Sequence, residues 1–118
     1  MEQGGEVGLL ARQLFPGGVA VESREPEEAI RTTRELLANA EVPAVFEGAF
    51  ENGGVLVRVD ILHRRKDGRW RLIEVKSTTD LKDQHLEDVA IQARVIVRSG
   101  VDLASSCLAH VNRTGSRI

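Results

Sequence analysis

Hydrophobic and polar side chains follow two different periods along this chain, and the change between them predicts both helices and strands. Between residues 44 and 76, apolar side chains recur at every second position over several stretches, as in strands with one face in a core. On either side they recur every three or four positions, as along one face of a helix. The expected elements, in order, are a helix at 6–14, a short extended piece at 19–21, a helix at 26–39, strands at 44–50, 55–64 and 69–76, a helix at 86–98 and a strand at 102–111.

This order of elements predicts one α/β domain with a central mixed, four-stranded sheet flanked by helices. Turn signals at residues 51–54 and 66–69 join the first three strands as antiparallel hairpins. The helix at 86–98 then returns the chain, so that the last strand runs parallel to the third. The helix residues expected to be buried are Ala29, Ile30, Thr33, Leu36 and Leu37, then Leu86, Val89, Ala90, Ala93 and Val97.

The turn at 66–69 sets which residues face one another across the second hairpin. If this hairpin is centred on Asp67, then Asp60 and Glu74 are directly opposed, and Lys76 returns to the same face two residues later. A slip of one residue would invert the two faces. The face with embedded charges carries Leu56, Arg58, Asp60, Leu62, Trp70, Leu72, Glu74 and Lys76, and the plain core face carries Val55, Val57, Val59, Ile61, Ile73 and Val75.

Two carboxylates opposed in this way are unfavourable unless a cation accompanies them. At about 4–5 Å they repel by about 4 kcal/mol at an effective dielectric of about 20. Mg²⁺ or Mn²⁺ would remove that repulsion, and both ions prefer oxygen ligands. Asp60, Glu74 and Lys76 therefore form a candidate metal site with an ammonium group beside it. The simpler alternative is a surface salt bridge from Lys76 to the two acids.

The composition is that of an ordinary globular domain, and it excludes several other classes. The 118 residues suffice for one domain with a modest core, and a net charge of −2 with a pI near 5.9 is not typical of nucleic-acid binders. Cys107 is the single cysteine, which excludes an internal disulfide and a cysteine-ligated zinc or iron–sulfur site. No apolar stretch is long enough for a membrane span and the start does not resemble a signal peptide, so we expect a cytoplasmic protein.

Basic residues gather around the second hairpin despite the negative overall charge. They form either a phosphate-attracting patch beside the candidate site or the solvated tip of a hairpin, and the sequence leaves both open. These residues are Arg58, Arg64, Arg65, Lys66, Arg69, Arg71 and Lys76.

The motifs around the candidate site resemble those of the PD-(D/E)XK nuclease superfamily, in its RecB-like branch. Residues 59–62 resemble the first acidic motif, residues 72–77 the E-x-K motif, and residues 89–92 the glutamine motif on the following helix. Residues 6–18 and 108–112 resemble an uncharacterised bacterial subgroup of this branch. Members of that subgroup are usually longer, which suggests an excised domain. The resemblance implies a restriction-endonuclease-like αβββαβ core.

The resemblance also implies a role for each site residue. Asp60, Glu74 and the carbonyl oxygen of Val75 would hold Mg²⁺ or Mn²⁺, which activates a water and neutralises charge on the phosphate. Lys76 would orient or deprotonate that water or stabilise the phosphorane oxygens. Gln92 would hold the Lys76 amine or a substrate phosphate, unless it is a half-buried structural glutamine.

Further residues are candidates for the same site. If the first hairpin is centred on Asn52 and Gly53, Glu47 faces Arg58 and lies on the face of Asp60. Glu47 is then either an additional metal ligand, directly or through water, or only the cross-strand partner of Arg58. Nucleic-acid-binding roles are expected for Arg58, Ser77, Thr78 and His85, with strand capping or plain exposure as the alternatives.

Three hypotheses follow for function. The first is a Mg²⁺- or Mn²⁺-dependent deoxyribonuclease domain that hydrolyses DNA phosphodiester bonds in repair, recombination or defence. The second is a catalytically impaired nucleic-acid-binding or interaction module, because Gly8 and Ile96 stand where relatives often carry His and Tyr, and Cys107 alone cannot hold their iron–sulfur cluster. The third is a small homodimeric endonuclease for branched DNA. RNA substrates, end cutting and a second metal ion stay open as alternatives.

Overall fold

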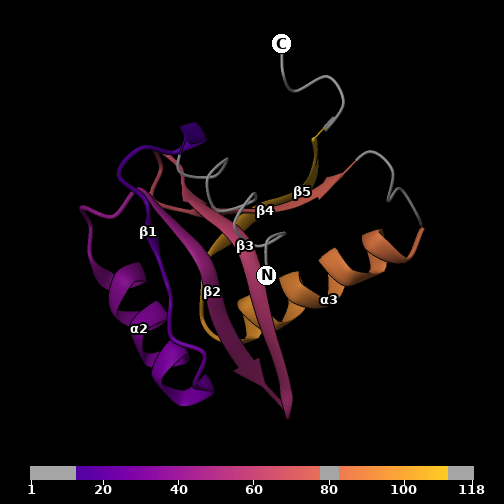
Figure 1. The fold of residues 1–118 in the computed structure, drawn as a ribbon, viewed down its shortest axis with the longest axis horizontal. Helices are drawn as coiled ribbons and strands as arrows, with labels where there is room; N and C mark the ends of the chain where they lie inside the picture. Colours follow the sequence, from indigo (N-terminus) through magenta and orange to yellow (C-terminus); the bar gives the residue numbers. More distant parts are fainter. Residues whose placement is uncertain (1–12, 78–82, 112–118) are drawn as a thin grey trace.

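The chain folds into a five-stranded mixed sheet with helices packed against it (Figure 1). This computed structural model describes residues 13–77 and 83–111. The elements are β1 (Val19–Ala20), α2 (Pro26–Ala38), β2 (Ala44–Asn52), β3 (Val55–Arg64), β4 (Trp70–Ser77), α3 (Asp83–Arg98) and β5 (Leu103–Val111). The strands lie in the order β1-β2-β3-β4-β5; the β2–β3 and β3–β4 pairs are antiparallel, and the β1–β2 and β4–β5 pairs are parallel.

The α/β class and the parallel pairing of the last strand with the third meander strand are confirmed. The sheet has one strand more than the four expected, because β1, inside the predicted extended piece, pairs with Val45 and Phe46 of β2. Residues 6–12 of the first predicted helix lie outside the described residues. The fold is therefore a mixed sheet with a meander at its centre and a parallel strand at each margin.

Helix α2 begins and packs as the sequence predicts. Glu25 caps it, because its carboxylate accepts a hydrogen bond of 2.7 Å from the amide of Glu28, and Pro26 occupies the first turn. Ala29 and Thr33 are fully buried, and the other predicted apolar residues of this helix pack at the margin of the same cluster. Burial of this one stripe fixes α2 against the sheet.

The far end of α2 is held by Arg64 of β3. Its guanidinium donates to the carbonyls of Leu37, Asn39 and Val42 at 3.0–3.1 Å. It also lies 4.2 Å from the ring centroid of Trp70, a cation–π contact. Arg64 of β3 therefore gives hydrogen-bond partners to backbone carbonyls at and beyond the end of α2, and these bonds join the end of the helix to a central strand of the sheet.

The register of the β3–β4 hairpin matches the sequence prediction. Ile61 pairs with Ile73, and the register continues to Arg64 and Trp70, which centres the hairpin on Asp67. Gly68, at a φ of 86°, supplies the left-handed residue of this turn. If the same register continues by one residue beyond Ile61 and Ile73, away from the turn, Asp60 lies opposite Glu74.

The β2–β3 hairpin differs from the prediction by its turn. Gly53 and Gly54 both have positive φ, 60° and 86°, so they form the two-residue turn and Asn52 pairs with Val55. In this register Ala49 faces Arg58. The predicted pairing of Glu47 with Arg58 is therefore wrong, because the turn lies one residue further along than the sequence suggested.

The two faces of the sheet carry separate hydrophobic clusters, and the alternation between them slips at Glu47. Val59 and Leu62 both belong to the larger cluster, under α2 and α3, whereas Ile61 belongs to the smaller one. Regular alternation would place Val59 with Ile61, so the predicted grouping of these two side chains is wrong. At the same level of the sheet, Glu47 of β2 lies between the partners of Val59 and Ile61 and has a φ of 61°, outside the extended conformation.

Helix α3 buries part of the predicted stripe, because Val89 is in the larger cluster and Ala93 packs against it, whereas the side chain of Leu86 lies outside the described residues. Val89, Val95 and Ile96 are in the larger cluster, whereas Ala90 is exposed and Val97 is 53% exposed. Residues 95–97 are all β-branched and apolar, so periodicity alone does not decide which of them faces the sheet. The contacts with the sheet and with β5 bury Val95 and Ile96 in place of the predicted Val97.

Candidate functional site

The centre of the candidate site is formed by Asp60 on β3 and Glu74 on β4. The paired residues of the hairpin end at Ile61 and Ile73, and the carboxylate of Asp60 then accepts a hydrogen bond of 2.8 Å from the amide of Val75. Glu74 is 7% exposed and Asp60 is half-buried. Burial of a carboxylate such as that of Glu74 carries a high desolvation cost.

Glu47 brings a third acid to the same level of the sheet from β2. Its neighbours pair as Phe46 with Ile61 and Gly48 with Val59, so the register sets Glu47 opposite Asp60. Burial raises the pKa of Glu47, the charge of Asp60 raises it further, and Arg58 lowers it. This arrangement is absent from the sequence pattern, because it depends on a turn one residue later and on the positive φ at Glu47.

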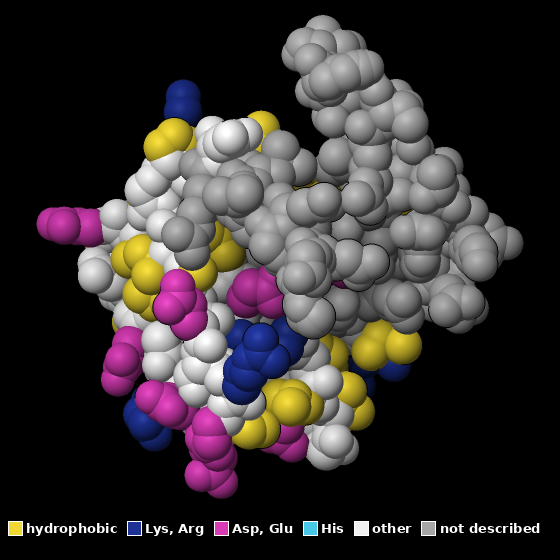
Figure 2. Space-filling view, viewed as in Figure 1, with side chains coloured by type: hydrophobic (Ala, Val, Ile, Leu, Met, Phe, Trp, Pro, Cys, Tyr) yellow, Lys and Arg dark blue, Asp and Glu magenta, His cyan; other side chains and the backbone are white. Residues whose placement is uncertain are grey.

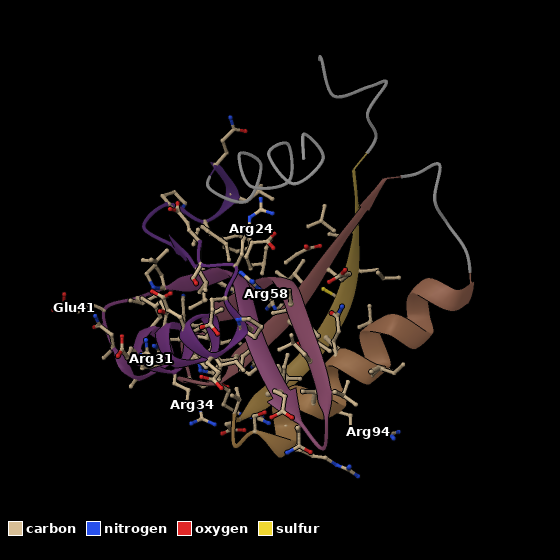
Figure 3. The ribbon with its side chains drawn as sticks, turned by 60° about the horizontal axis from the view of Figure 1, so that its bottom comes forward. Arg24, Arg31, Arg34, Glu41, Arg58 and Arg94 are labelled. Carbon is tan, nitrogen blue, oxygen red and sulfur yellow. The ribbon has the colours of Figure 1, made fainter. Side chains whose placement is uncertain are left out.

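Arg58 is turned toward the backbone. Its Nε donates to the carbonyl of Glu47 at 2.9 Å, Nη1 to that of Ser23 at 3.1 Å and Nη2 to that of Val21 at 2.9 Å. Figure 3 shows Arg58 near the middle of the structure, while Arg94 points outward from α3. Arg58 therefore joins the segment before α2 to the strained residue of β2, and these contacts engage all three of its nitrogens.

The structure describes only the backbone of several other predicted site residues. Lys76 and Ser77 continue β4, where they pair with His110 and Val111 of β5. Their side chains, Thr78 and the side chain of His85 lie outside the described residues.

Gln92 lies on the side of α3 that faces the sheet. It follows Val89 and precedes Ile96 on the buried stripe, and its side chain is half-buried. Its Oε1 is buried and has no hydrogen-bond partner among the described residues. A buried amide oxygen without a partner carries a desolvation cost, so Gln92 is a polar group that a ligand or a further side chain could satisfy.

The carboxylates at this level of the sheet come from Glu47, Asp60 and Glu74, on three adjacent strands. Within residues 13–77 and 83–111, no group of three or more His, Cys, Asp or Glu side chains is gathered to hold a metal ion. Asp60 and Glu74 nevertheless supply hard oxygen donors, and the carbonyl of Val75 is adjacent in the chain. This donor chemistry fits Mg²⁺ or Mn²⁺ better than a softer metal.

The basic residues of the β3–β4 hairpin are mostly engaged in structural contacts. Arg65 bridges to Asp67 at 3.2 Å and Arg69 to Asp102 at 2.9 Å, while Arg64 caps α2. The turn lies six residues from Glu74 along β4, roughly 20 Å at 3.3 Å per residue. On the face seen in Figure 2, acidic and basic side chains of the described residues are interspersed. These observations favour a solvated hairpin tip over a phosphate-attracting patch at this turn.

His63 lies in a partly buried, aromatic environment that the sequence did not predict. His63 packs against Phe15, with the ring centroids 4.6 Å apart, and its Nδ1 is buried without a hydrogen-bond partner among the described residues. Burial lowers the pKa of His63, and Arg71 lowers it further. Both effects favour the neutral imidazole of His63, beside Phe15 of the smaller cluster.

Comparison of the chain with protein-family models, with curated proteins and with solved structures gave no match. Within the described residues, no helix has both the length and the apolar character needed to cross a bilayer. The functional argument therefore stands on the site itself.

Proposed function

We propose that this chain is a Mg²⁺- or Mn²⁺-dependent nuclease domain of the PD-(D/E)XK type that hydrolyses DNA phosphodiester bonds. The observation that supports the proposal is the β3–β4 register, which pairs Ile61 with Ile73 and, continued by one residue, would set Asp60 opposite Glu74. The hydrogen bond from the amide of Val75 to the carboxylate of Asp60 lies at the same place. A meander followed by a helix and a parallel strand agrees with the restriction-endonuclease-like αβββαβ core, and β1 is an addition to it.

Each residue has a task that its position supports. Asp60 and Glu74, with the carbonyl of Val75, would hold the metal ion, which lowers the pKa of a bound water and offsets charge on the phosphate. Lys76 would orient the attacking water or stabilise the phosphorane oxygens. Gln92 would offer its buried amide to the Lys76 amine or to a substrate phosphate.

A cleavage assay tests this proposal. The wild-type chain is incubated with Mn²⁺ or Mg²⁺ and a mixture of linear, nicked and branched DNA, beside Asp60→Asn and Glu74→Gln prepared in the same way. We expect both substitutions to reduce cleavage to background, because each removes a charged ligand and keeps the side-chain shape. Glu51→Gln, at an exposed acid near the hairpin turn, is the matched control and should cleave as the wild type does.

Cleavage retained in either site variant would contradict the proposal. The second candidate function is a binding or interaction module without turnover, and the observation in its favour is the engagement of Arg58, Arg64, Arg65 and Arg69 in structural contacts. It predicts Mn²⁺-independent binding to a partner and no hydrolysis of any DNA in the mixture.

A further inference from the structure

β5 forms one edge of the sheet, and it lacks the charged residues, prolines and short length that usually protect an edge strand. It pairs with β4 from Leu103 to Val111, and in the described part of the chain no strand lies beyond it (Figure 1). An edge strand presents a row of backbone N–H and C=O groups that can pair with another strand. Proteins commonly protect such edges with charged residues, proline, bulges or short length.

The sequence of β5 carries little of that protection. None of its nine residues is Asp, Glu, Lys, Arg, Pro or Gly. The irregular step in its pairing lies at the beginning, where Trp70 pairs with Leu103 and Arg71 with Ser105, and the register is regular from Ser105 to Val111. Ser105, Ser106 and Cys107, at the middle of the strand, are exposed. A neutral, open segment with a regular register over this length is suited to strand addition.

We propose that β5 pairs antiparallel with β5 of a second copy of this chain, so that the two sheets become continuous across a two-fold axis. A second copy is the occupant that the charge pattern favours, because a neutral strand meets its own copy without opposing like charges. The opposite margin, β1, is only two residues long, so the assembly closes as a dimer and does not continue into a fibre.

The longest register for such a dimer is centred on Cys107. All nine residues then pair, with Leu103 opposite Val111 of the second copy and Cys107 opposite Cys107 of the second copy. Directly opposed residues on antiparallel strands have Cβ atoms about 4.5–5.5 Å apart. A cysteine at the centre is therefore a direct reporter of this register. The inference concerns the sheet margin and does not depend on the proposed nuclease activity.

Sedimentation equilibrium over a wide concentration series tests the dimer under reducing conditions. We expect a monomer–dimer equilibrium for the wild type and for Cys107→Ser. Cys107→Lys should raise the dissociation constant at least tenfold, because it sets two ammonium groups against each other at the centre of the interface. Thermal unfolding of this variant checks that the exposed substitution leaves the fold intact. A monomer at every concentration would overturn the proposal.

Cross-linking then tests the register. Mild oxidation should convert the wild-type dimer to a disulfide-linked dimer through Cys107, because a disulfide forms only between closely opposed Cβ atoms. Ser106→Cys in a Cys107→Ser background is the matched control, because residue 106 faces residue 108 of the second copy and should cross-link much less. A dimer that persists in Cys107→Lys, or that cross-links equally from both positions, would overturn β5 pairing in this register.

Discussion

Glu47 is the residue whose conformation most directly shapes the candidate site. Among the described residues it is the only one other than glycine with positive φ, at 61°, and Arg58 holds its carbonyl at 2.9 Å. Residues with a Cβ pay about 1–2 kcal/mol in this region of the Ramachandran map. Strain of this kind persists when the surroundings over-determine it, and it is concentrated at functional sites.

Replacing Glu47 with glycine measures that strain. Glu47→Gly should raise the free energy of unfolding by about 1 kcal/mol relative to Glu47→Gln, because both lack the charge and only glycine relieves the backbone. Urea unfolding of the two variants provides the comparison. Equal stabilities, or a less stable glycine variant, would show that the left-handed conformation carries no strain.

The pH dependence of stability tests the electrostatic environment of Glu47. Its pKa is raised in the folded state, chiefly by burial, so the folded protein holds this proton more tightly than the unfolded chain does. The resulting stability is present below the ordinary pKa of 4.5 and is lost as pH rises through the folded pKa. Glu47→Gln should therefore gain stability relative to the wild type between pH 4 and pH 7, as measured by urea unfolding across that range. A constant difference would contradict the shift.

At the scale of elements, the packing of α2 on β2 depends on a single buried hydroxyl group. Thr33, fully buried, donates to the carbonyl of Ala29 at 2.8 Å and accepts from the amide of Ala49 at 2.9 Å. The second bond gives a partner to a strand amide beneath the helix. It couples the helix to the strand that carries Glu47.

Thr33→Val should reduce the free energy of unfolding by about 1–3 kcal/mol, because the shape is kept while the amide of Ala49 loses its partner in a buried place. Thr33→Ser keeps the hydroxyl and should restore most of the hydrogen-bond contribution, with a remaining loss from the missing methyl group. Thr32→Val is the matched control on the neighbouring residue, which is half-buried. Chemical denaturation gives the free energy of unfolding of all three variants. Similar losses of stability in Thr32→Val and Thr33→Val would contradict a specific contribution from the Thr33 hydroxyl.

Sequence reasoning succeeded for elements whose ends carry strong local signals. Asp67 and Gly68 fix the β3–β4 turn, and Pro26 fixes the start of α2, so the register and the helix follow directly. It failed where two turn positions, or two sides of a helix, are equally compatible with the local sequence and tertiary contacts decide between them. The turn at Gly53 and Gly54, one residue later than expected, moved the cross-strand partner of Glu47 by two residues, from Arg58 to Asp60. The run of β-branched residues at 95–97 concealed which of them is buried on α3.

At the scale of the whole molecule, the meander sets acids from three adjacent strands at one level of the sheet. The pair from β3 and β4 was expected from sequence spacing. Glu47 was also expected on the face of Asp60, but its position opposite Asp60 required the three-dimensional structure. The basic hairpin tip lies at the other end of the same strands and stabilises α2 and the turn. The proposed chemistry therefore lies at the end of the β3–β4 pairing away from the turn, and the structural contacts lie at the turn end.

The most direct test of this account is the effect of Mn²⁺ on unfolding of the full chain. At a concentration about 100 times its dissociation constant, an ion that binds only the folded state stabilises it by about 2.7 kcal/mol. We predict that Mn²⁺ stabilises the wild type and Glu51→Gln in this way, and that Glu74→Gln loses the effect. The same stabilisation in Glu74→Gln, or no stabilisation of the wild type at any Mn²⁺ concentration, would contradict a metal site at Asp60 and Glu74.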